Sequence, residues 1–98
     1  MPKTETLPWD AADHLDSQAA IAAYLNAVLE DGDPALIAAA LGDVARSRGM
    51  RAVSRETGLG RTSLYKALSA EGRPEFTTVM KVVEALGLRL SVSPIEGS

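Results

Sequence analysis

The chain contains no cysteine, one histidine and few aromatic side chains. The lack of cysteine excludes a disulfide framework and a thiolate metal site. His14 has no second histidine to accompany it, so we expect no histidine-ligated metal site. The 98 residues include one Trp, one Phe and two Tyr, and the hydrophobic fraction of 46% is rich in alanine. We therefore expect a single domain whose modest core consists of closely packed helices.

Long apolar runs are also missing, because none approaches the ~18 residues that a membrane-spanning helix requires. The first 13 residues, MPKTETLPWDAAD, lack the basic start and apolar stretch of a signal peptide. We expect a cytoplasmic protein that does not enter a membrane. No nucleophile, base and orienting group stand together, and no glycine-rich phosphate loop follows a strand, so we expect neither an enzyme nor a cofactor.

Positive charge is scarce in the first half of the chain. Residues 1–45 hold one basic and eight acidic residues, whereas residues 46–98 hold nine basic and five acidic ones. The net charge of −3 therefore conceals a basic second half. Such asymmetry indicates different partners for the two halves.

The basic half contains the segment 50–69, MRAVSRETGLGRTSLYKALS. It predicts two short helices joined by a turn at Gly58, Leu59 and Gly60, where the glycines permit a sharp reversal. Leu64 and Leu68 lie four residues apart on one face of the second helix. Two helices joined by such a turn are typical of the helix-turn-helix motif, whose second helix enters the DNA major groove.

The other faces of these helices form a candidate DNA-binding surface. They offer cationic, hydroxyl and aromatic groups without a carboxylate on the second helix, which suits a polyanion. The candidate residues are Arg55, Arg61, Thr62, Ser63, Tyr65 and Lys66, together with Thr77 in the first turn of the last helix. Alternatively, this is the solvated face of a structural hairpin, with Tyr65 packed in the core and Thr77 serving only to start its helix.

The residues of this surface differ in which part of DNA they are expected to contact. Arg61 is best placed to make a bidentate contact with a guanine edge. Thr62 and Ser63 reach a base edge or a phosphate, whereas Lys66 and Arg55 suit the phosphate backbone.

Three longer helices flank this segment. The first begins after Asp16 or Ser17 and runs to about residue 30, the second begins at Asp33-Pro34 and runs to about residue 48, and the third spans about 75–86. Their expected inward stripes are Ile21, Leu25, Val28 and Leu29; Leu36, Ile37, Ala40, Leu41 and Val44; and Phe76, Val79, Met80, Val83 and Leu86. Arg46 and Arg48 suit either the negative end of their helix or a DNA backbone.

Residues 88–93 alternate between apolar and polar side chains, which predicts a β-strand. Leu88, Leu90 and Val92 share one face of it. Because a single strand cannot satisfy its own backbone, we expect it to pair with its copy in a second subunit, so that these three residues form a dimer contact. The alternative is an extended tail laid over the core.

The predicted architecture is all-α: a compact, repressor-like domain of five to six helices with a short C-terminal β-strand. We expect a flexible N-terminus over residues 1–8, the domain over 9–93 with the two-helix segment at 50–69, and a loose C-terminus over 94–98.

The segments GDPALIAAALGDVARSRGM, GLGRTSLYKALS and PEFTTVMKVVEALGLRLSV closely resemble the addiction-module antidote proteins. These are antitoxins with a helix-turn-helix of the Cro/repressor (XRE) type. The resemblance extends from about Trp9 to Val92. Gly60 departs from it, since a serine-like N-cap is expected before the second helix of the motif.

This resemblance implies an antitoxin of a type II toxin–antitoxin module. It implies a RelE/ParE-like toxin as partner, and a homodimer that binds double-stranded DNA at its own promoter. The acidic first half would hold a basic toxin, through Trp9, Asp10 and Asp13; alternatively, Trp9 packs on the core. The competing interpretation is a stand-alone XRE-type repressor without a toxin partner.

Overall fold

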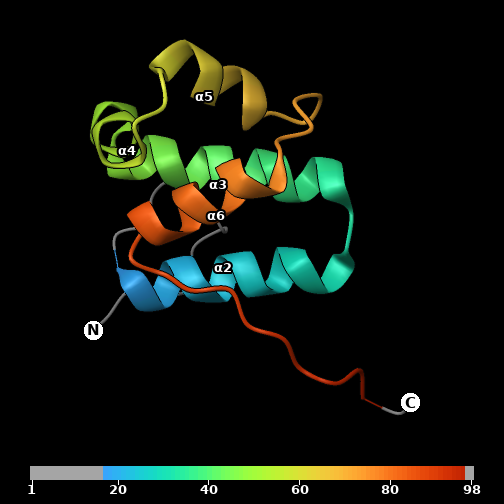
Figure 1. Ribbon diagram of the computed structural model, residues 1–98. Coiled ribbons are helices and arrows are strands. Elements are labelled where there is room, and N and C mark those ends of the chain that lie inside the picture. Colours follow the sequence, from blue (N-terminus) through green and yellow to red (C-terminus); the bar gives the residue numbers. More distant parts are fainter. Residues whose placement is uncertain (1–16, 97–98) are drawn as a thin grey trace, which may run out of the picture.

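The computed structural model describes residues 17–96, which form five helices joined by short connections (Figure 1). The helices are α2 (Gln18–Asp31), α3 (Pro34–Arg48), α4 (Met50–Thr57), α5 (Arg61–Ala67) and α6 (Phe76–Ala85). The described residues contain no strand, so the all-α class is confirmed. Within this range, no helix combines the length and apolar character needed to cross a bilayer.

The helix ends follow the capping residues that the sequence predicted. Ser17 accepts a hydrogen bond from the backbone N–H of Ala20 at 3.1 Å, and Asp33 accepts one from the N–H of Ala35 at 3.0 Å. Each side chain satisfies a donor that has no partner inside its helix. Gly32 ends α2 with φ of +79°, a conformation that glycine adopts without steric cost.

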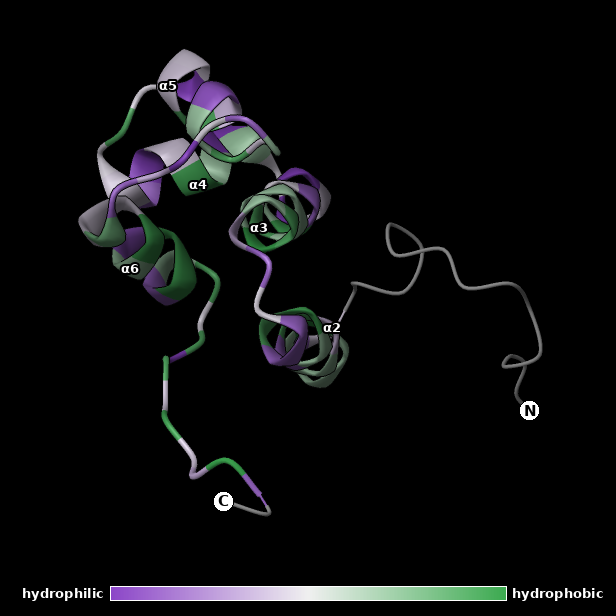
Figure 2. Cartoon of the chain, turned by 90° about the vertical axis from the view of Figure 1, so that its right-hand side faces the viewer, coloured by the Kyte–Doolittle hydropathy of each residue, from purple (hydrophilic) through white to green (hydrophobic). Residues whose placement is uncertain are grey.

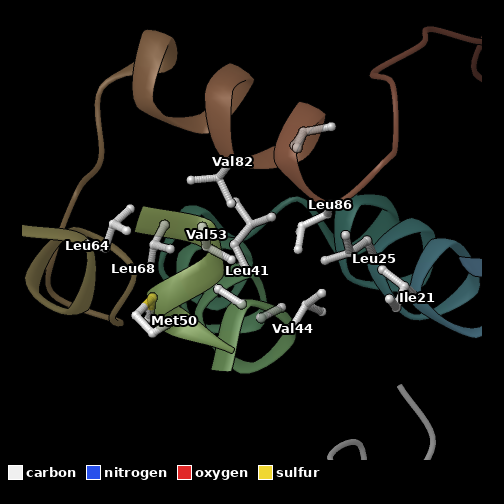
Figure 3. Close-up of a cluster of buried hydrophobic side chains, with 13 residues drawn as sticks. Ile21, Leu25, Leu41, Val44, Met50, Val53, Leu64, Leu68, Val82 and Leu86 are labelled. Atoms are coloured by element: carbon white, nitrogen blue, oxygen red, sulfur yellow. The ribbon is translucent and has the colours of Figure 1, made fainter. Parts of the chain in front are cut away.

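Helix α3 is the centre of the fold, because α2, α4, α5 and α6 all pack against it. Figure 3 shows Leu41 and Val44 of α3 meeting Val53 of α4 and two residues of α6, Val82 and Leu86. All five side chains are buried. Burying each one contributes on the order of 1.5–3 kcal/mol to folding, so this cluster is the main source of stability.

A polar contact joins three helix ends on one side of this core. The Arg48 guanidinium donates to the carbonyl oxygen of Leu86 at 3.1 Å and to Gln18 Oε1 at 2.9 Å, and Gln18 Nε2 donates to the same carbonyl at 3.0 Å. The carbonyl at the end of α6 is thereby satisfied by α2 and α3. Arg48 was expected at the negative end of its own helix or at a DNA backbone, and it instead donates to the carbonyl at the end of α6.

A second polar contact links α2 to α3. The Tyr24 hydroxyl donates to Asp43 Oδ2 at 3.2 Å, and Arg46 donates to the other carboxylate oxygen. Burial, followed by the charge of Asp43 and the hydrogen bond to it, raises the pKa of Tyr24 above its ordinary value. The contribution of this contact to stability is therefore fully present below the ordinary pKa of tyrosine and is lost as the pH rises through the raised pKa of Tyr24.

The predicted apolar stripes are wrong at three helix ends. Leu29, Leu36 and Phe76 were expected to point inward, but all three are exposed, Phe76 to 70%. Leu29 lines an apolar groove together with Ile37 of α3 and Val79 of α6. Val82, which is fully buried, was missing from the predicted stripe of α6.

The predicted C-terminal β-strand is not seen in the single chain, where residues 88–93 belong to no strand. A strand requires a hydrogen-bonded neighbour, and no other described segment offers one. Leu88 and Leu90 are half-buried against the core, whereas Val92 is exposed. The first part of the segment thus follows the alternative expectation of a tail laid over the core.

The α4–α5 pair and this tail lie at opposite ends of the molecule. Both Figure 1 and the view turned by 90° in Figure 2 place α5 at the top and the tail at the bottom, beyond α2. A partner bound at one end therefore leaves the other end accessible.

We expect Gly42→Ala to destabilise the protein. A Cβ atom at Gly42, which is buried in α3, would collide with the backbone carbonyl oxygen of Leu68 at the end of α5. Because backbone atoms cannot move aside as a side chain would, the substitution should lower the free energy of unfolding by about 1–3 kcal/mol. Urea denaturation followed by circular dichroism measures this change.

Gly60→Ser also adds a side chain to a glycine, but at a position where there is room for it. The nearest atom to a Cβ at Gly60 is Ser63 Oγ at 4.0 Å, so the side chain has room, and a serine there can cap α5. We expect it to be neutral or to raise stability by a few tenths of a kcal/mol. Equal destabilisation by both substitutions would contradict the close approach of α3 and α5.

Candidate nucleic-acid interface

The segment 50–69 forms two short helices and a tight turn, as the sequence predicted. Gly58 ends α4 with φ of +79°, and its N–H donates to the carbonyl of Ser54 at 2.9 Å. Leu59 is half-buried and packs against the core, and Gly60 directly precedes α5. The turn is thus anchored by an apolar side chain between two glycines.

Two hydroxyl groups of α4 fix the conformation of this turn. Thr57 Oγ1 accepts from the N–H of Leu59 at 3.2 Å and donates to the carbonyl of Val53 at 2.8 Å. Ser54 Oγ donates to the carbonyl of Leu59 at 2.5 Å. Both backbone polar groups of Leu59 are therefore satisfied from α4, which sets the direction in which α5 begins.

Helix α5 is seated by its apolar face. Leu64 and Leu68 are each 1% exposed, and α5 packs against α3 and α4. All the predicted binding residues of this helix lie outside that face and are exposed: Arg61, Thr62, Ser63, Tyr65 and Lys66. Tyr65 is 48% exposed, so it is not the core residue that the alternative interpretation expected.

Helix α4 adds positive charge beside α5. Arg55 is exposed, as is Arg51 one turn earlier. Arg51 was absent from the predicted set, although its spacing of four residues from Arg55 places the two on one helix face. Glu56 is the acidic residue of α4, whereas α5 carries none.

The remaining predicted residues belong to other segments of the chain. Thr77 is exposed in the first turn of α6, a helix that does not contact α5. Trp9, Asp10 and Asp13, predicted to bind a toxin, lie outside the described residues, as does His14. Among the described residues, no group of three or more histidine, cysteine, aspartate or glutamate side chains is arranged to hold a metal ion.

Charge distribution, rather than net charge, distinguishes the α4–α5 surface. Residues 17–96 contain nine basic and nine acidic residues. Arg46 and Arg48 are engaged in hydrogen bonds within the fold. The outer face of α5 combines two cations with hydroxyl donors and an aromatic ring. This arrangement can donate hydrogen bonds to phosphates and base edges, whereas it offers no carboxylate base and no nucleophile–base pair.

Comparison with known proteins gives a family for the chain. The family described as "Probable addiction module antidote protein" matches residues 5–94. A protein from Haemophilus influenzae (strain ATCC 51907 / DSM 11121 / KW20 / Rd), named only "Uncharacterized protein", is 49% identical over 84 residues, which cover 86% of this chain and 87% of that protein. No solved structure shows a significant match.

We expect Ser54→Ala and Thr57→Val each to lower the free energy of unfolding by about 1 kcal/mol, because each leaves a half-buried polar group of Leu59 without its partner. Chemical denaturation measures both. Ser93→Ala, at an exposed tail position, is the control and should stay within about 0.5 kcal/mol of the parent protein. If both turn variants matched the control, the hydroxyls would not hold the turn.

Proposed function

The chain belongs to the family of probable addiction module antidote proteins, and on that premise we propose that it is a DNA-binding antitoxin that represses its own operon. Family membership implies a toxin partner in general. We further propose that this partner is a RelE/ParE-like protein encoded beside the chain, and that the α4–α5 pair is an XRE-type helix-turn-helix with α5 as its recognition helix.

The observation that supports DNA binding best is that α5 has one buried apolar face and one exposed face without acidic residues. Leu64 and Leu68 are buried, which fixes the helix rigidly, while its outer face is exposed and free of acidic residues. A helix presented in this way at one end of a molecule fits a major groove of about 12 Å width. In this arrangement Arg61, at the first turn of α5, reads a base edge.

Phosphate contacts would come from the residues around that helix. Lys66 lies toward the end of α5 and Arg55 on α4, and we add Arg51 to the predicted set because it shares the exposed face of α4. Such contacts supply affinity that does not depend on sequence and that weakens with salt. A homodimer would present two α5 helices to successive grooves about 34–36 Å apart.

The toxin would bind elsewhere on the chain. The α2–α3 connection carries exposed Glu30, Asp31 and Asp33, and the preceding residues 1–16 are acidic as well. An acidic surface attracts a basic partner and keeps that region away from DNA. The acidic α2–α3 connection and the outer face of α5 therefore suit two different partners.

We expect the protein to bind a duplex taken from the region upstream of its own reading frame, with an affinity that falls steeply as salt is raised. Arg61→Ala should lose about 1–3 kcal/mol of discrimination between that duplex and a scrambled one. Lys66→Ala should weaken binding to both duplexes alike and reduce the salt slope by about 1. Fluorescence anisotropy across a salt series measures these effects.

Lys81→Ala provides the matched control, because it removes an exposed cation from α6, a helix that does not contact α5. It should bind like the parent protein unless total charge alone drives binding. Absence of specific binding near physiological salt, with the neighbouring gene product present, would contradict the DNA-binding proposal.

Toxin neutralisation gives a separate prediction. Co-expression of the chain should restore growth to cells that produce the neighbouring toxin, and the combined substitution Trp9→Ala, Asp10→Asn and Asp13→Asn should abolish that rescue while operator binding persists. Growth curves and co-purification measure the two properties. A chain without an adjacent toxin gene that still binds its promoter would favour the stand-alone repressor.

A further inference from the structure

The tail that follows α6 has the side-chain alternation of a strand but no partner strand among the described residues. Leu88 and Leu90 turn toward the core, while Arg89 and Ser91 are exposed, so the segment has the alternation of a strand. The N–H of Leu88 still bonds to the carbonyl of Val83. Beyond it, no backbone hydrogen bond joins residues 89–96 to another described residue. An extended segment of this kind is a template for a second strand.

An apolar groove lies directly beside that segment. It has a volume of about 160 Å³ and is enclosed by α2, α3, α6 and the tail. Leu25, Val28 and Ile37 line it, and residues 88–91 of the tail form one of its walls. A strand added to the tail on this side would therefore cover the groove as well as pair with the backbone.

The tail itself carries an apolar side chain that lacks a covering partner. Val92 is 97% exposed, on the same side of the alternation as Leu88 and Leu90. Figure 2 shows hydrophobic positions continuing along the tail after it leaves the helices. In an extended segment with period two, Val92 would face the same way as the two leucines that pack against the core.

We propose that residues 88–92 of two copies pair as an antiparallel ribbon centred on Leu90, so that Val92 of each copy covers the groove of the other. This register places Leu88 opposite Val92 of the second copy and Arg89 opposite Ser91 of the second copy. The ribbon's apolar face would lie across both cores, which a two-stranded ribbon requires for stability. The proposal rests on the homodimer included in the proposed function and gives that dimer its contact.

Neighbouring registers are less favourable for identifiable reasons. Centring the pair on Arg89 would place two guanidinium groups directly opposite each other, and like charges in that position are destabilising. Centring it on Ser91 would place Pro94 opposite Leu88, and proline has no N–H for the ladder. Of these three registers, only the one centred on Leu90 both separates the arginines and keeps proline outside the ribbon. This self-complementarity favours a second copy of the chain as occupant.

Engineered cysteines test the register cleanly, because the chain has none of its own. Arg89→Cys protein is mixed with differently tagged Ser91→Cys protein and oxidised mildly. Directly opposite side chains lie within disulfide reach, whereas diagonal ones do not. The dominant covalent dimer should therefore be the mixed one. Arg89→Cys with Ser93→Cys, which is one pair out of register, should give little.

Val92→Asp tests the contact without threatening the fold, because the side chain is almost fully exposed. The parent protein should sediment as a dimer and Val92→Asp as a monomer of unchanged helicity, whereas Ile95→Asp, outside the ribbon, should remain dimeric. A monomeric parent, a dimeric Val92→Asp protein, or equal cross-linking in the two cysteine mixtures would overturn the proposal. These measurements use protein without DNA or toxin, so they fail or succeed independently of the promoter-binding experiment.

Discussion

The burial of Leu64 and Leu68 against α3 is the constraint on which the arrangement of the α4–α5 surface depends. The end of α5 approaches α3 so closely that only glycine fits at position 42. Because one face of this seven-residue helix is buried, the side chains on its other faces point toward solvent. A short helix in isolation is barely stable, so packing rather than helix propensity holds this surface in place.

The turn before α5 is also fixed by contacts with the rest of the fold, here through its backbone. Leu59 enters the core, and its N–H and carbonyl are taken up by Thr57 and Ser54. The apolar contact and the two hydrogen bonds together fix the turn, and the turn sets the direction in which α5 begins. A defined direction would matter for the proposed recognition helix, because a base contact requires side chains placed within a fraction of an ångström.

The sequence predicted those features that depend on neighbouring residues. The caps at Ser17 and Asp33 and the glycine turn all arise within a few positions, and they occur where the pattern placed them. Features that depend on distant parts of the chain were not predictable. Whether Phe76 is covered depends on which helix lies nearby, and the bond from Arg48 to the end of α6 joins residues 38 positions apart. The predicted strand at residues 88–93 is not seen in the single chain for the same reason, since the alternating pattern does not by itself supply a neighbouring strand.

Local charge, rather than the net charge of −3, matters for the proposed contact with DNA. Screening limits charge interactions to about 8–10 Å at physiological salt, so a bound duplex would sense mainly the charges nearest to it. The two cations on the outer face of α5 would therefore count for more than acidic residues beyond that distance. A single α5 would make few contacts with DNA, and linking two such sites would raise the apparent affinity without any new contact. A self-complementary tail at the far end of the fold would provide that linkage while leaving the α5 surface uncovered.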